Sequence, residues 1–264
     1  MKKITGTMQF GTKTVLLDID DGELAEFVLH EYILNITPIP AKRHKLQVCV
    51  ISGAYETKYL VLEGGKLIRK IRMDVNVSVN IKEFILQGLI ELCLSKNGFY
   101  FIHASSYVID KNLFIFLGPS GSGKTTILQL LKPKNVTSND TLVLQRSGKG
   151  VIFLYTSPFD GNSSVTQTKK IKIKNIQFYK LTKNKINVIS KLELHEKVEL
   201  LITNMNLHMF AMQTNIASIS TLKATCQIQA AKTALDLQNS SEAHNLNFNL
   251  GLNNAIFSNI TQHE

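Results

Sequence analysis

The sequence predicts an α/β fold: a small β-rich region over residues 1–79, followed by a domain of strands and helices over residues 80–264. Three observations lead to this fold class. The first 79 residues alternate in short runs rich in β-branched side chains. Apolar residues at helical spacing then begin near Asn80. Further along, a short apolar strand, a glycine-rich loop and a helix follow one another around residue 120.

Composition sets outer limits on the molecule. The chain has 264 residues, which allows one large domain or two small ones at ~150 residues each. Its three cysteines are too scattered for a disulfide framework or a paired metal site. No apolar run approaches the ~18 residues that a membrane span needs, and the first residues lack the apolar stretch of a secretory signal. We therefore expect no membrane span and a cytoplasmic location.

The formal net charge is +10, which can attract nucleic acid, anionic lipid or acidic substrates. Charge alone defines no site, and lysine-rich composition also serves solubility. A nucleic-acid-dependent ATPase is one function class that this charge leaves open. Because no recognition motif accompanies the charge, a nucleic-acid partner is unlikely on this sequence.

The first half of the chain reads as strands and one helix. Strands are predicted in four β-branched or alternating runs, at residues 14–19, 46–51, 59–62 and 67–73. The pair Gly64-Gly65 marks the turn between the last two. A helix is predicted to begin at Asn80, with Glu83 as its capping-box partner, and to end at Gly98.

The second half mixes both kinds of element. Strands are predicted at residues 99–109, 113–117, 135–138, 141–145, 151–155 and 170–181, and helices at 124–132, 192–210 and 217–237. The lysines at 170, 172 and 174 would share one face of their strand, which is usually a solvated face. The asparagine-rich tail after Lys232 reads as loosely ordered.

A phosphate-binding pattern stands in mid-chain. The motif G-x-x-x-x-G-K-[ST] is matched by eight consecutive residues, which we name the phosphate loop: Gly118, Pro119, Ser120, Gly121, Ser122, Gly123, Lys124 and Thr125. Glycines let successive backbone N–H groups turn around an anion, and the following helix, with Thr126 in its first turn, adds its positive end. Lys124 would reach the β- and γ-phosphates, and the Thr125 hydroxyl would bind Mg²⁺. The motif predicts a nucleoside triphosphate site.

Motifs that usually accompany a phosphate loop distinguish the classes of nucleotide-binding protein. No Asn-Lys-x-Asp guanine reader and no Leu-Ser-Gly-Gly-Gln segment occurs, so a GTPase or a transporter ATPase is not expected. No apolar strand after the loop ends directly in Asp or Glu, so the acidic strand that usually accompanies a phosphate loop is missing. Asp140 follows a short strand, where it could bind Mg²⁺ or accept a hydroxyl proton, although Ser-Asn-Asp is also an ordinary turn.

His103 is the second catalytic candidate. If residues 99–109 and 113–117 form a hairpin, a three-residue turn places His103 opposite Pro119 and a two-residue turn places it opposite Ser120. Either register would bring an imidazole to the phosphates, where it could contact phosphate oxygens or orient an acidic partner. The alternative is a histidine that only packs and hydrogen-bonds within the sheet.

Four segments in order resemble the HPr kinase/phosphorylase family and its shorter relatives, some of which act on precursor peptides. They are His103-Ala104-Ser105-Ser106, residues 116–126, Thr137-Ser138-Asn139-Asp140 and Thr156-Ser157-Pro158-Phe159, within residues 99–161. The resemblance implies a P-loop core similar to that of phosphoenolpyruvate carboxykinase, ATP and Mg²⁺ as cofactors, and phosphorylation of a serine hydroxyl. It equates His103 with the family's histidine. The acceptor would be a peptide, a protein or a small molecule, and a homo-oligomer stays open.

One position departs from this family. The family shows Ser-Asp-Asp where this chain has Ser138-Asn139-Asp140, and an amide cannot take a proton from an acceptor. Either Asp140 performs both tasks, or positioning suffices, or the protein binds nucleotide and works through a partner with weak catalysis. Because phosphoryl transfer through a loose transition state asks little of a base, we expect activity to survive.

Overall fold

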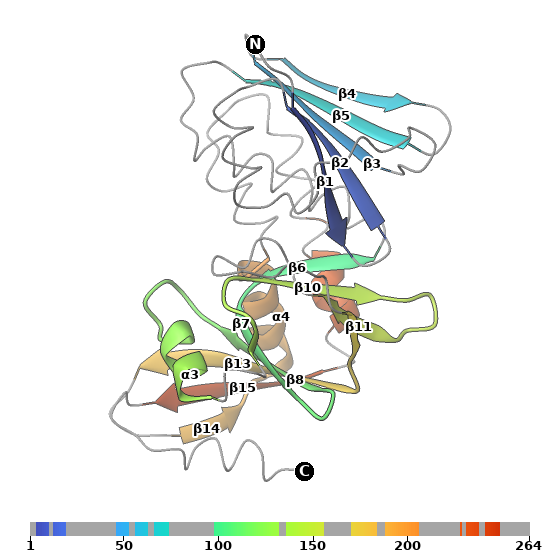
Figure 1. The fold of residues 1–264 in the computed structure, drawn as a ribbon. Helices are drawn as coiled ribbons and strands as arrows, with labels where there is room; N and C mark the ends of the chain where they lie inside the picture. Colours follow the sequence, from blue (N-terminus) through green and yellow to red (C-terminus); the bar gives the residue numbers. More distant parts are fainter. Residues whose placement is uncertain are drawn as a thin grey trace.

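The computed structural model describes residues 4–10, 13–19, 46–52, 56–62, 66–73, 98–131, 136–155, 170–183, 188–205, 228, 231–237 and 241–248. These residues form a mixed α/β structure dominated by strands, as the sequence predicts (Figure 1). The predicted boundary between residues 79 and 80, and nearly all of the helix expected from Asn80, lie outside the described residues. Gly98, at the predicted end of that helix, has the left-handed backbone expected of a C-terminal glycine, with φ +75°.

Five strands of the N-terminal region form one sheet in the order β1-β2-β3-β5-β4 (blue to cyan in Figure 1). The strands are β1 (Ile4–Phe10), β2 (Lys13–Ile19), β3 (Leu46–Ser52), β4 (Glu56–Leu62) and β5 (Lys66–Met73). All four strands predicted for this region are confirmed, and β4 and β5 form the expected antiparallel hairpin. β1, which the sequence analysis did not predict, pairs with β2 along its whole length.

The rest of the described chain builds two further sheets, ordered β12-β11-β10-β6 and β14-β15-β13-β8-β7-β9. Their strands are β6 (Phe99–His103), β7 (Ser105–Ile109), β8 (Asn112–Leu117), β9 (Val136–Ser138), β10 (Thr141–Arg146), β11 (Ile152–Tyr155), β12 (Lys170–Lys172), β13 (Asn175–Lys183), β14 (Val188–Lys191) and β15 (Ser241–Phe248). β8 and β13 are parallel neighbours, so their carboxyl ends reach the same edge of the sheet.

Helices cover both faces of the six-stranded sheet. α3 (Lys124–Leu130) packs Ile127 and Leu128 against Phe114 and Phe116 on one face of β8. On the other face, α4 (Leu194–Thr203) joins a cluster with Leu113, Ile115 and Leu117. Residues 113–117 of β8 are therefore all buried, which explains why they are continuously apolar rather than alternating. Residues 231–237 form a further helical segment.

Two predicted strands are each divided between sheets. Residues 99–109 break at Ala104, so that β6 pairs with β10 while β7 pairs with β8. The backbone around the break is held from two directions: His103 N donates to Asn204 O at 2.6 Å, and Ala104 N donates to Asp140 O at 2.8 Å. Residues 170–181 break likewise after Lys172, where Ile173 turns into the core. Residues typical of strands lie on both sides of each break, so strand propensity alone does not show where the pairing partner changes.

The turn between β7 and β8 has two residues, but the strand register that it sets differs from both predicted registers. It consists of Asp110 and Lys111, with φ of 47° and 69°, and pairs Ile109 with Asn112. Positive φ at both central positions matches the right-handed twist of a hairpin. Since His103 lies beyond the break in another sheet, both predictions that placed it by this hairpin are wrong.

The asparagine-rich tail contains an interior strand, contrary to the prediction of loose order. β15 lies between β13, to which it is parallel, and β14, to which it is antiparallel. Ala243 and Leu246 are buried at 3% and 1% exposure. The strand owes its place to hydrogen bonding on both edges and to these two core side chains, because its polar sequence has weak strand propensity of its own.

Candidate functional site

The phosphate loop connects the carboxyl end of β8 to the first turn of α3, as the sequence predicts. Gly121 and Gly123 take left-handed backbone angles, with φ of 75° and 99°. These conformations are costly for residues with a Cβ, which explains glycine at both positions. Pro119, Ser120, Gly121 and Thr125 are exposed, while Thr126 is half-buried on α3. The loop therefore offers an open surface just ahead of a helix N-terminus.

Gly118 closes the base of this loop. A Cβ built on Gly118 would meet Ser122 Oγ at 2.6 Å, so no larger residue fits without movement. The Ser122 hydroxyl is buried and has no hydrogen-bond partner among the described residues. A buried polar group without a partner inside a loop of backbone N–H groups fits an anion that would supply the missing acceptor.

Lys124 folds back over the loop. Its Nζ donates to Gly118 O at 2.7 Å and to Pro119 O at 3.1 Å, and the residue is only 9% exposed. Those two bonds leave one of the three ammonium donors for a ligand. Burial lowers the pKa of Lys124, and the negative charge of Asp140 opposes that shift. The ammonium and the Asp140 carboxylate therefore act on each other across the site.

Asp140 is paired with His103. The two side chains approach to 3.0 Å between Nδ1 of the histidine and Oδ1 of the aspartate. The β6–β10 ladder sets this contact, because His103 pairs with Thr141, the residue after Asp140. The predicted proximity of His103 to the loop is thus reached by a different strand pairing from the one the sequence analysis used.

Asn139 faces the other side of the site. Its Oδ1 accepts a hydrogen bond from Thr125 Oγ1 at 3.4 Å. The Asn139 carbonyl accepts a bond from Ser105 Oγ at 3.2 Å, which ties the turn to the start of β7. Adjacent residues therefore contact different partners: Asn139 contacts the predicted metal ligand Thr125, and Asp140 contacts His103.

Beside the loop lies a cavity of about 490 Å³, which we name the loop cavity. One part of it is lined by His103 and by the loop residues Gly118, Pro119 and Ser120. The rest is lined by residues that the sequence analysis did not assign to a site: Lys180, Leu181, Glu196, Glu199, Leu200, Thr203 and Asn204. Lys180 comes from β13, opposite Leu117 in the register. In the predicted helix at 192–210, the polar residues at 196, 199 and 203 have the helical spacing that was the available sign of this polar face.

A magnesium site is compatible with the residues that are present. Within the described part of the chain, no group of three or more His, Cys, Asp or Glu side chains could hold a metal ion. Mg²⁺ bound to a nucleotide usually takes only one or two protein ligands and completes its shell with phosphates and water. Thr125 and Asp140, the predicted ligands, lie at the loop, as does the Asn139 amide oxygen. The donor set is that of a nucleotide-bound metal rather than a metal held by protein alone.

Comparisons with known proteins leave the family open. No protein-family model matches the chain, and no curated protein is significantly similar to it. No helix among the described residues is long and apolar enough to cross a membrane. The fourth resembling segment, residues 156–159, lies outside the described residues. What the site can do must therefore be argued from its own chemistry.

Proposed function

We propose that the protein is an ATP- and Mg²⁺-dependent kinase that phosphorylates a hydroxyl group, with a P-loop core of the HPr kinase type. One observation supports this most strongly: Asp140 is held by His103 at 3.0 Å and acts electrostatically on Lys124 of the phosphate loop. A carboxylate whose charge acts on the lysine of such a loop is where a kinase needs an acceptor-activating group.

In this proposal the loop residues bind and orient ATP. Backbone N–H groups of the loop and the free donor of Lys124 contact the β- and γ-phosphates. Mg²⁺, when bound, would supply positive charge that neutralises the β- and γ-phosphates. Thr125 and Asp140 are the residues that would hold it, with the Asn139 amide as a neighbouring oxygen donor.

The Asp140 carboxylate would also handle the proton. The acceptor oxygen forms a bond to the γ-phosphorus, the bond from that phosphorus to the β,γ-bridging oxygen breaks, and the acceptor's proton passes to Asp140. ADP leaves with the electron pair of the broken bond. His103 keeps the carboxylate oriented through its Nδ1 contact and is a positioning residue in this scheme.

Lys124→Ala tests the proposal. Removing the ammonium should weaken binding of MgATP by more than about tenfold and abolish phosphate transfer to serine peptides, because charge-assisted contacts to phosphate are lost. Titration calorimetry and transfer of labelled phosphate measure the two effects. Lys174→Ala is the matched control, because Lys174 is exposed and lies at the end of β8 away from the phosphate loop. Its backbone N–H there donates to Lys111 O at 2.9 Å. Unchanged affinity in Lys124→Ala would refute the nucleotide site.

A second candidate function rests on Asn139. With an amide where the resembling family has an acid, the chain would bind nucleotide without efficient transfer and act through a partner protein. The same calorimetry and transfer assays separate the two functions. MgATP binding with no phosphorylated product from any acceptor favours the binding module, and product formation favours the kinase.

A further inference from the structure

We infer that the loop cavity is the acceptor site and that the acceptor carries a positively charged group next to its hydroxyl. This inference rests on the proposed kinase function and adds the substrate class. It comes from the distribution of hydrogen-bond donors and acceptors around the cavity. The shared chemistry is a hydroxyl beside an ammonium or guanidinium, as in a serine next to lysine or arginine.

One side of the cavity is suited to phosphate. Gly118, Pro119 and Ser120 line it, and Lys180 adds a second positive charge. Lys180 is exposed and stands opposite Leu117, the residue before the loop, so it lies at the edge where the nucleotide's phosphates would sit. Lys180 would repel a positively charged group of the acceptor, so that group would bind elsewhere in the cavity.

The α4 side supplies acceptors instead. Asn204 lines the cavity and is only 6% exposed. Its Nδ2 donates to Leu200 O at 2.7 Å, which leaves Oδ1 as the unused acceptor of this side chain; the described residues offer it no donor. The residue as a whole is more than nine-tenths buried at the cavity wall, and an N–H donor of a bound ligand could pair with this oxygen.

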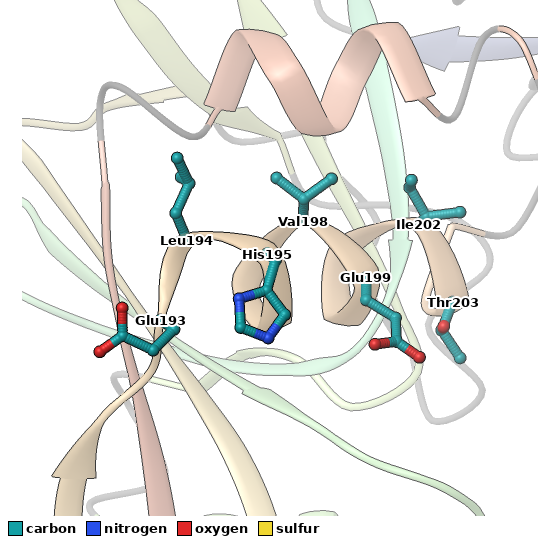
Figure 2. Close-up of a pocket in the computed structure, with 7 residues that line it drawn as sticks. All are labelled: Glu193, Leu194, His195, Val198, Glu199, Ile202 and Thr203. Carbon is teal, nitrogen blue, oxygen red and sulfur yellow. The ribbon is translucent and has the colours of Figure 1, made fainter.

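Two carboxylates stand on the same side. Glu196 uses Oε2 to accept a bond from Glu193 N at 2.9 Å, as part of the capping box that begins α4. Glu199 lines the cavity one turn further on, and its carboxylate makes no hydrogen bond or ion pair with the described residues. Figure 2 draws a different pocket beside α4, which Glu199 also lines, and there its side chain leaves the helix on the side away from Val198 and Ile202. Its carboxylate is thus available to a ligand.

The α4 side of the loop cavity is acidic, whereas the whole chain is basic. Although the protein carries a net charge of +10, the α4 side of the cavity has two carboxylates and one amide oxygen. An acceptor with a cationic group would place that group at Glu199 and Asn204, and its hydroxyl toward the His103–Asp140 pair, since all line or adjoin one cavity. The charges at the two ends would then fix the acceptor's direction.

The experiment compares short serine peptides whose residues beside the serine are lysine, alanine or glutamate. Anisotropy of labelled peptides, with the protein saturated by a non-hydrolysable ATP analogue, measures binding, and labelled ATP measures transfer. We expect the lysine peptide to be favoured over the alanine peptide by roughly tenfold or more. Glu199→Gln should bring the ratio near one, and Glu199→Lys should favour the glutamate peptide. 2-Aminoethanol as competitor distinguishes a small amino alcohol from a peptide source.

The matched control is Asp110→Asn, which removes one exposed carboxylate at the far end of β8, in the β7–β8 turn, and should leave the preference unchanged. Equal binding of all three peptides, no binding of any peptide or amino alcohol, or a preference that survives Glu199→Gln would overturn the inference. Equal phosphate transfer to all three peptides would support the kinase function and refute the cationic acceptor. Peptide binding that depends on Glu199 but gives no phosphorylated product would support the cationic ligand and refute the kinase function.

Discussion

At the scale of single residues, the neighbours Asn139 and Asp140 have different surroundings. Asp140 contacts His103 at 3.0 Å, whereas Asn139 contacts Thr125 at 3.4 Å. In the proposed mechanism Asp140 accepts the proton and would also bind Mg²⁺ with Thr125, whereas Asn139 offers only a neighbouring oxygen donor. A neutral amide oxygen can bind a metal ion but cannot take a proton, so the departure from Ser-Asp-Asp falls on a position that the proposed proton transfer does not use.

Exchanging the two functional groups tests this division. Asp140→Asn should lower kcat by about 10²–10⁴-fold, because a positioned general base is lost. Asn139→Asp should leave turnover nearly unchanged, since it adds a carboxylate where none is needed for proton transfer. Single-turnover transfer of labelled phosphate measures both variants.

The control for these two variants is a comparison of their thermal unfolding midpoints with that of the parent protein. Asp140→Asn keeps the shape of the side chain and the backbone bond from Ala104 N, so its thermal midpoint should match that of the parent. Turnover in Asp140→Asn equal to the parent's would remove Asp140 from its role. A large gain in Asn139→Asp would instead move the base to position 139.

At the scale of elements, the phosphate loop depends on a close contact at its base. A Cβ on Gly118 would lie 2.6 Å from Ser122 Oγ and 3.0 Å from Ser122 Cβ, so the loop would have to open. The same loop carbonyls, Gly118 O and Pro119 O, hold the Lys124 ammonium. Opening the base would therefore also shift the lysine.

Gly118→Ala tests this coupling. Overpacking typically costs about 1–3 kcal/mol, and we expect ATP affinity to fall roughly tenfold or more as the loop adjusts. Ser122→Ala added to Gly118→Ala should recover part of the affinity, because it removes the atom in closest contact. Gly148→Ala in the β10–β11 turn is the control: a Cβ there meets nothing within 4 Å. Parental affinity in Gly118→Ala would show that the loop does not need this close approach.

At the scale of the whole molecule, the C-terminal strand completes the sheet that carries the site. Leu246 of β15 packs at 1% exposure in the cluster that contains Phe116 of β8 and Leu128 of α3. These are the elements on either side of the phosphate loop. The tail thus supports the loop from the far end of the sequence.

Leu246→Ala should lower the free energy of unfolding by about 2–5 kcal/mol, because a buried leucine leaves a cavity. Leu235→Ala, at a side chain that is 53% exposed, should change it by less than about 0.5 kcal/mol. Urea denaturation followed by circular dichroism compares the two. Equal losses would mean that β15 is not part of the core.

The sequence predicted the local elements well and their partners poorly. The phosphate loop, the strand before it and the helix after it follow from glycines and apolar runs within a few residues of one another. The breaks at Ala104 and after Lys172, and the strand in the asparagine-rich tail, depend on hydrogen-bond partners that are distant in the chain. Propensity and alternation contain no information about such partners.

From sequence alone come the phosphate loop with Lys124 and Thr125, and Asp140 as the acid at the end of the next short strand, because motif and strand-end position are local properties. Only the tertiary structure brings His103 onto Asp140, and only it places the polar face of α4 and Lys180 around one cavity. The pairing of β6 with β10 sets the first contact, and the cavity joins residues of β13, α4 and the phosphate loop. Their distances are set by strand pairing and core packing across the molecule, which no local stretch of sequence specifies.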